Sequence, residues 1–119
     1  MRKILKINKI TEGRDLMFDD INFKNGNIVY DDFQIDTKLP LEKQADNLKE
    51  DMFQVRFLNK YTIDIGWYPC TDINGKFIIY LIKEYNWEEP LYKESCRSIE
   101  ELKQHLIKCV NIVETQLNI

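Results

Sequence analysis

Hydrophobic side chains recur at every second position through the middle of the chain. Between residues 53 and 83 they form three runs, separated by Asn59-Lys60 and by the turn-forming sequence Asp72-Ile73-Asn74-Gly75. Pro69 closes the second run, because a proline cannot donate to a strand ladder. The third run, residues 77–82, is apolar on both faces and predicts a strand that is central or covered on both sides. We therefore predict an antiparallel meander.

The period becomes helical near the C-terminus. Ser98 and Glu101 match a capping box, which predicts a helix that begins after Ser98 and runs to about residue 114. One apolar stripe follows the cap and should pack on the sheet: Ile99, Leu102, Leu106, Cys109, Val110 and Val113. A weaker helical spacing over residues 37–51, with Pro40 in the first turn, predicts a shorter central helix.

Further strands are predicted on both sides of the meander. Residues 91–96 add one strand after it, and residues 2–10 form a candidate strand at the start of the chain. The Asn25-Gly26 pair predicts a hairpin between residues 21–23 and 28–30, with Phe33 and Ile35 extending its second strand. The expected fold is α+β: an antiparallel sheet of about four to six strands, packed against the long C-terminal helix and the shorter central helix.

Composition and charge limit the class of protein. The 119 residues contain no linker or repeat, so we expect a single domain over residues 1–119. The net charge of −3 argues against a dedicated nucleic-acid binder. Acids outnumber bases strongly in residues 15–36 and 84–101. Such stretches either attract a basic partner or form a solvated face that keeps the protein soluble.

The cellular compartment follows from what the chain contains. No stretch approaches the roughly 20 apolar residues of a membrane span. The first nine residues lack the apolar run of a secretory signal. The three cysteines, Cys70, Cys96 and Cys109, are odd in number and irregularly spaced, which predicts reduced cysteines that mostly serve packing, and no disulfide framework. A cytoplasmic protein is expected.

Catalytic and metal-binding signals are weak. The one histidine, His105, falls within the predicted C-terminal helix and is expected on its surface, without a recognisable nucleophile. Asp19-Asp20 and Asp31-Asp32 would coordinate a cation if they came together, but solvated turn acids are the simpler interpretation. The glycines form no phosphate loop. We expect no catalytic residue, metal or cofactor.

Aromatic residues beside acids are the stronger functional signal. Tryptophan and tyrosine in polar loops often anchor protein interfaces, and neighbouring carboxylates would suit a basic partner. The predicted partner-binding residues are Asp64, Trp67, Tyr68, Asp72, Trp87, Glu88 and Glu89. The alternative is that both tryptophans plug the sheet edges and pack against the helices.

The C-terminal half resembles a known family over about residues 60–113. The similarity is carried by Ile63-Asp64-Ile65-Gly66-Trp67-Tyr68-Pro69, by Asp72-x-Asn74-Gly75-x-Phe77, by Asn86-Trp87-Glu88-x-Pro90-Leu91 and by Arg97-Ser98-x-x-Glu101-Leu102. This pattern resembles the small immunity proteins of bacterial contact-dependent inhibition and related polymorphic-toxin systems. The N-terminal half carries no such similarity.

The resemblance implies a protein with no catalysis of its own that binds the C-terminal domain of one cognate toxin, often a nuclease, and blocks it. It implies no direct contact with nucleic acid or membrane, and a monomer or weak homodimer when free. Two alternatives remain open. One is a non-catalytic regulatory or homo-oligomeric domain that uses a sheet edge or the last helix. The other is a small hydrolase that uses carboxylates such as Asp64 or Glu88.

Overall fold

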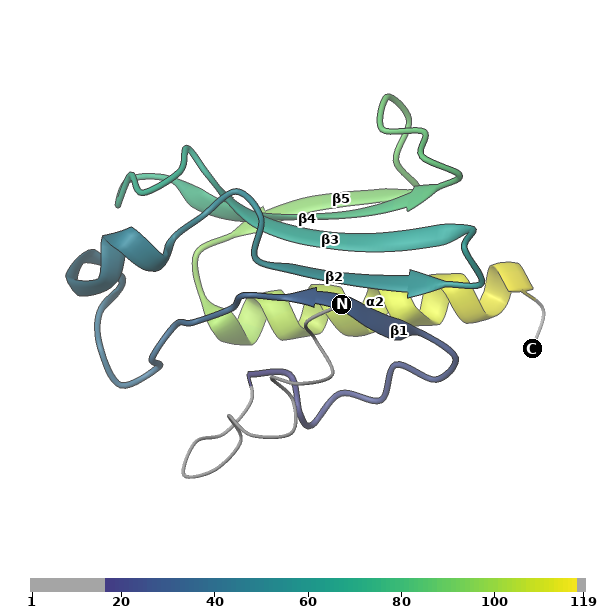
Figure 1. Ribbon diagram of the computed structural model, residues 1–119, viewed down its shortest axis with the longest axis horizontal. Helices are drawn as coiled ribbons and strands as arrows, with labels where there is room; N and C mark the ends of the chain where they lie inside the picture. Colours follow the sequence, from purple (N-terminus) through teal and green to yellow (C-terminus); the bar gives the residue numbers. More distant parts are fainter. Residues whose placement is uncertain (1–16, 118–119) are drawn as a thin grey trace.

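Within the described residues, the chain forms a five-stranded antiparallel sheet with a long helix on one face (Figure 1). The computed structural model describes residues 17–117. The strands pair in chain order, β1-β2-β3-β4-β5, so the α+β meander predicted from the sequence is confirmed. The elements are β1 Asn27–Asp31, the 3-10 helix η1 Leu41–Asn47, β2 Phe53–Phe57, β3 Tyr61–Tyr68, β4 Lys76–Lys83, β5 Tyr92–Cys96 and α2 Ile99–Leu117.

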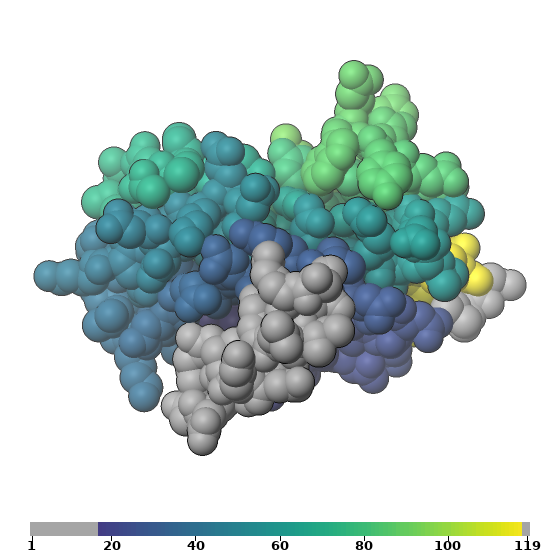
Figure 2. Space-filling model, viewed as in Figure 1, coloured from purple at the N-terminus to yellow at the C-terminus, as the bar shows by residue number. Residues whose placement is uncertain are grey.

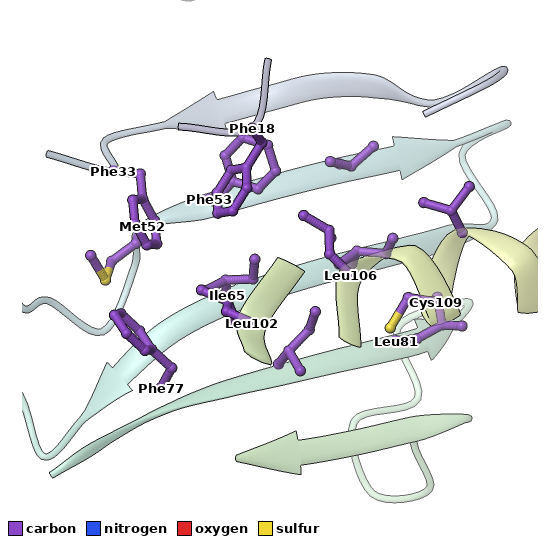
Figure 3. Packing of buried hydrophobic residues seen from close by; sticks show 14 of the residues in the cluster. Phe18, Phe33, Met52, Phe53, Ile65, Phe77, Leu81, Leu102, Leu106 and Cys109 are labelled. Atoms are coloured by element: carbon purple, nitrogen blue, oxygen red, sulfur yellow. The ribbon is translucent and has the colours of Figure 1, made fainter. Parts of the chain in front are cut away.

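The alternating residues of the meander form the core layer under α2. In the strand register, Phe53 lies opposite Ile65, which lies opposite Ile79, and these positions face the helix. Leu102 and Leu106 of α2 pack on this face and are completely buried (Figure 3). In proteins most of the stability of a helix comes from packing its apolar face, so this contact is the main stabilising interaction of α2.

The Ser98 cap predicted at the start of α2 is present, although Glu101 contacts the Ser98 hydroxyl and not the Ser98 backbone N–H that a full capping box uses. The backbone N–H of Glu101 donates to Ser98 Oγ at 3.1 Å, and the Ser98 hydroxyl donates to Glu101 Oε1 at 3.3 Å. The helix runs to Leu117, three residues beyond the predicted end. The predicted apolar stripe is buried, apart from the half-buried Ile99.

Phenylalanine side chains from the segments before and after β1 complete the layer beside α2. The ring of Phe18 lies 4.9 Å from that of Phe33 and 4.7 Å from that of Phe53, measured between centroids (Figure 3).

The hairpin predicted around Asn25-Gly26 is wrong in its strand pairing. Residues 21–23 form no strand, and β1 pairs with β2 instead. The strand β1 ends at Asp31, so Phe33 and Ile35 are buried without extending it.

The central helix is shorter and tighter than predicted. Pro40 occupies the N-cap position of η1, and the backbone leaves helical geometry at Gln44. The buried Gln44 amide explains this break. It donates to the carbonyl oxygens of Asp36 at 2.9 Å and Leu39 at 3.2 Å, and its own oxygen accepts from the Asp36 N–H at 2.9 Å. A regular helix over residues 37–51 would leave these loop groups without their partner.

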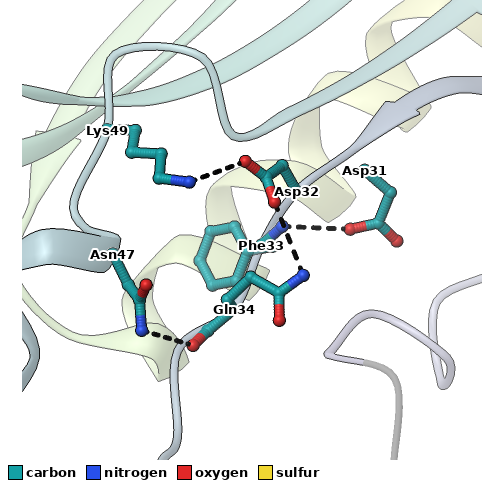
Figure 4. A network of polar contacts seen from close by, with 6 residues as sticks. All are labelled: Asp31, Asp32, Phe33, Gln34, Asn47 and Lys49. Atoms are coloured by element: carbon teal, nitrogen blue, oxygen red, sulfur yellow. Dashed lines mark hydrogen bonds and ion pairs between the residues drawn. The ribbon is translucent and has the colours of Figure 1, made fainter. Parts of the chain in front are cut away.

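Polar contacts join the end of β1 to the segment after η1 (Figure 4). Lys49 Nζ lies 3.0 Å from Asp32 Oδ2, and this hydrogen-bonded carboxylate raises the pKa of the lysine. The Asn47 amide donates to the Gln34 carbonyl oxygen at 3.4 Å. These contacts hold the two crossing segments together at one end of the sheet. The candidate strand over residues 2–10 lies outside the described residues.

The sheet face turned away from α2 carries polar and aromatic side chains together with Ile78 and the buried Ile82, and we call it the open face. Its central row is Gln54, Asp64, Tyr80 and Lys93, which lie opposite one another on β2 to β5. Gly66 also lies on this face. A Cβ atom at Gly66 would collide with the backbone carbonyl of Glu50, so the close approach of this segment requires glycine.

Candidate functional site

The connection between β4 and β5 projects from the side of the sheet opposite α2 (Figure 1). We call residues 84–91 the β4–β5 loop; Figure 2 shows it in green as a protrusion on the surface. Tyr85 and Trp87 are exposed in this loop, by 61% and 46%. The carboxylates of Glu84, Glu88 and Glu89 are also exposed there. Two exposed rings in one short connection form a clustered apolar surface, which is more informative than single exposed residues.

The rings of the β4–β5 loop are held against the open face. Trp87 packs edge-to-face on Tyr80, with the ring centroids 5.6 Å apart. The guanidinium carbon of Arg56 lies 5.5 Å from the centre of the Tyr85 ring. In the backbone, the Leu91 N–H donates to the Leu81 carbonyl at 2.8 Å. These contacts position the rings before any partner arrives, which lowers the entropy lost on binding.

Asp64 and Tyr68 lie on the same open face but are less available. Asp64 is only 5% exposed, and the Gln54 amide donates to its Oδ2 at 2.6 Å. Burial raises the pKa of the Asp64 carboxyl in spite of this hydrogen bond. The Tyr68 hydroxyl donates to the Glu50 carbonyl oxygen at 3.4 Å, and burial raises its pKa to about 12. A partner on this face would meet the Tyr68 and Tyr80 rings before the Asp64 carboxylate.

Trp67 and Asp72 support the fold at the other end of β3. The Trp67 indole is completely buried, edge-on to Phe77 at 4.8 Å, and its Nε1 donates to the Asp72 carbonyl oxygen at 2.7 Å. Asp72 Oδ1 accepts from the Asn74 N–H at 2.9 Å and shapes the β3–β4 turn. Trp67 is thus a core residue, which corrects the prediction that it offers its ring to a partner.

The seven predicted residues therefore fall into separate groups. Trp87, Glu88 and Glu89 share the β4–β5 loop, and Asp64 and Tyr68 lie on the neighbouring sheet face. Sequence reasoning missed Tyr80, Tyr85 and Arg56. The alternation in β4 places Tyr80 on the face opposite Ile79, and Tyr85 precedes Trp87 in the same acidic loop, so the sequence contained a signal for both. Nothing in the sequence pointed to Arg56.

Among the described residues, the histidine, cysteine and acidic side chains that could serve catalysis or metal binding either make other contacts or do not gather at one place. His105 Nδ1 lies 2.6 Å from the Tyr92 hydroxyl, a contact between α2 and β5. Cys96 and Cys109 are buried free thiols, and burial raises the pKa of Cys109 to about 12. Within residues 17–117, no three histidine, cysteine or acidic side chains gather as metal ligands. The helices of this range include none that is long and apolar enough to cross a membrane.

A hollow of about 510 Å³ lies at the opposite end of the sheet from the β4–β5 loop. Its walls are the segment from Ile35 to Leu41 and the start of α2. Arg97 and Lys103 face it together with Asp36 and Glu100, so it combines both signs of charge. It contains none of the residues predicted as a site, and no cluster of like charges marks it for a particular ligand.

Comparison of the chain with protein-family models, with curated proteins and with solved structures finds no match.

Proposed function

We propose that this chain is an immunity protein that binds and neutralises the toxin domain of a cognate bacterial toxin in the cytoplasm. The observation that carries the proposal is the β4–β5 loop, where Tyr85 and Trp87 are exposed yet held in place by Arg56 and Tyr80. Rigid aromatic side chains are the residues that most often dominate protein interfaces. The similarity of residues 60–113 to immunity proteins supplies the class of partner.

The charge of the loop favours a basic partner surface. Residues 84–91 contain Glu84, Glu88 and Glu89 and no basic residue. A nuclease toxin needs a basic groove for the phosphates of its substrate. An acidic, aromatic loop that enters such a groove would exclude the nucleic acid by occupying its place. This mechanism requires no bond-making chemistry from the immunity protein.

Co-expression tests the proposal directly. The candidate toxin is the C-terminal domain encoded by the gene immediately upstream of the gene for this chain. Expressed alone in a bacterial host, this domain should arrest growth, and co-expression of the wild-type chain should restore it. Purified chain and toxin domain should bind each other. If the chain neither rescues growth nor binds the domain, the proposal is rejected.

A single substitution should locate the interface. Trp87→Ala removes the ring that packs on Tyr80 and should weaken binding by about tenfold or more, as expected for a central aromatic anchor. Leu39→Ala is the matched control, because Leu39 is a similarly exposed hydrophobic residue outside the loop. Both variants should remain folded, because neither residue belongs to the buried core, and thermal unfolding would check this. Equal binding by Trp87→Ala and the wild type would place the interface elsewhere.

A further inference from the structure

A second connection lies at the same end of the sheet as the β4–β5 loop. We call residues 58–60 the β2–β3 turn (Figure 1). The backbone N–H of Glu84 donates to the Lys60 carbonyl oxygen at 2.7 Å, which ties the start of the loop to this turn. Arg56, in the strand that leads into the turn, reaches the Tyr85 ring. The two connections therefore form one continuous part of the surface.

Exposed hydrophobic side chains gather on these two connections. Within residues 17–117, seven large hydrophobic side chains are exposed, and four of them are Leu58, Tyr85, Trp87 and Leu91. The other three, Leu39, Ile73 and Ile107, lie on separate parts of the molecule. Single exposed hydrophobic residues are normal on a protein surface, but a cluster at one end of a sheet marks an interaction site.

Leu58 is a poor residue for the position it occupies. It has a φ of 53° and its side chain is 65% exposed, so it gains little from burial and strains the backbone. Asn59 has a φ of 55°, which makes this a turn with two left-handed residues. Such turns normally take asparagine or glycine at both positions. Asn59 fits this rule and Leu58 does not.

The β4–β5 loop contains a second pair of left-handed residues. Glu84 has a φ of 52° and Tyr85 a φ of 64°, and Tyr85 is exposed by 61%. In both connections, therefore, a residue with a strained positive φ, Leu58 or Tyr85, exposes a large side chain to solvent. Positions that break the local rules without benefit to the fold are expected where a surface serves binding.

We propose that the β2–β3 turn and the β4–β5 loop are two halves of one docking surface for a basic protein partner, with Leu58 as the anchor of the first half. The partner chemistry follows from the β4–β5 loop, which exposes the carboxylates of Glu84, Glu88 and Glu89 and contains no basic residue. The cations around it are Lys60 in the turn, Lys83 before the loop, and Arg56 and Lys93, which lie over the Tyr85 and Tyr80 rings. The occupant is the toxin domain of the proposed function, on which this inference rests. The new element is that the interface extends beyond the loop to Leu58.

Leu58→Asn separates the needs of the fold from those of binding. Asparagine tolerates a positive φ and removes an exposed hydrophobic side chain, so the variant should unfold at a temperature a few degrees higher than the wild type. The same variant should bind the toxin domain about tenfold more weakly, measured by titration calorimetry. Leu58→Met keeps an apolar side chain and should bind as the wild type does.

Ile73→Asn is the matched control, because Ile73 is an exposed hydrophobic residue in the turn at the opposite end of β3. It should leave toxin binding unchanged. If Leu58→Asn binds as tightly as the wild type, the inference about the turn is overturned and the proposed function stands. If the wild type binds no toxin domain, the proposed function is itself rejected. A wild-type dimer that Leu58→Asn dissociates would make the surface a contact between copies and would also overturn the inference.

Discussion

At the scale of single residues, Asp64 shows how the open face combines polarity with burial. Its carboxylate lies in the middle of the sheet, is 5% exposed and has Gln54 as its hydrogen-bond donor. Because burial raises its pKa, the ionised form is less favourable in the folded protein than in the unfolded chain. Asp64 should therefore lower the stability of the fold at neutral pH.

The sign of the effect gives a pH-dependent prediction. Between the ordinary pKa of 3.8 and the raised pKa of the folded state, the folded protein binds more protons, so wild-type stability falls as pH rises through this window. Asp64→Asn keeps an acceptor for Gln54 and does not titrate. Its free energy of unfolding relative to the wild type should increase through the window and stay constant above it.

Urea unfolding at a series of pH values between 3 and 7 would measure this difference. Gln104→Ala, a change at an exposed residue of α2 that does not titrate, is the control and should show no comparable trend. A wild-type protein that instead gained stability relative to Asp64→Asn with rising pH would contradict the raised pKa.

The two tryptophans show what residue-level patterns predict about the site. Both lie beside polar residues and shortly before a proline, and both looked like interface anchors. The alternation of β3 places Trp67 on the face of Ile63 and Ile65, which the sheet buries under α2, whereas Trp87 follows the end of β4. The strand register therefore separates the two tryptophans, and the alternation of residues in the sequence already indicated this register. Arg56 was not predictable, because its contact with Tyr85 depends on how the loop folds back over the sheet.

At the scale of elements, the sequence pattern predicted correctly those strands and helices that are determined by residues close together in the chain. The meander and α2 followed from period and capping, because neighbouring strands pair through short turns and a helix is capped by its own residues. The pairing of β1 with β2 joins Ile28 to Val55 across a long intervening segment, and no local pattern encodes that contact. Similarly, η1 is broken by a glutamine that bonds residues outside the helix.

The start of α2 offers a prediction at this scale. Ser98→Ala removes the acceptor for the Glu101 N–H and should lower the free energy of unfolding by about 1 kcal/mol. Ser98→Asp restores an acceptor at the helix N-terminus and should recover most of the loss. Thermal or urea unfolding would measure both.

Ser95→Ala is the control, because Ser95 is exposed on β5 outside the cap. A loss at Ser95 equal to that at Ser98 would show that the effect is not due to capping. Since the cap lies far from the β4–β5 loop, the Ser98 variants should bind the toxin domain as the wild type does.

At the scale of the whole molecule, charge should govern how fast the partner is captured. The acids of the β4–β5 loop protrude at one end, so they meet an approaching basic surface first (Figure 2). The double variant Glu88→Lys/Glu89→Lys should associate with the toxin domain about tenfold more slowly at low salt, and its rate should depend less on ionic strength. Stopped-flow kinetics at several salt concentrations would measure this.

Glu42→Lys/Asp46→Lys provides a control with the same change in net charge. Both residues are exposed on η1, at the other end of the molecule (Figure 1). If only net charge mattered, the two double variants would slow association equally. A larger effect at Glu88 and Glu89 is expected, because local field decides the encounter. Unchanged kinetics in both variants would argue against electrostatic steering of the partner.

The chain-order pairing of the strands has a consequence for engineering. In such a sheet every second connection emerges at the same end, which is why the β2–β3 turn and the β4–β5 loop meet there. Neither connection contributes to the layer between sheet and helix, so each tolerates changes in length and sequence while strand register is preserved. The scaffold is therefore suited to retargeting: libraries restricted to these two segments would vary recognition while the hydrophobic interior remains constant.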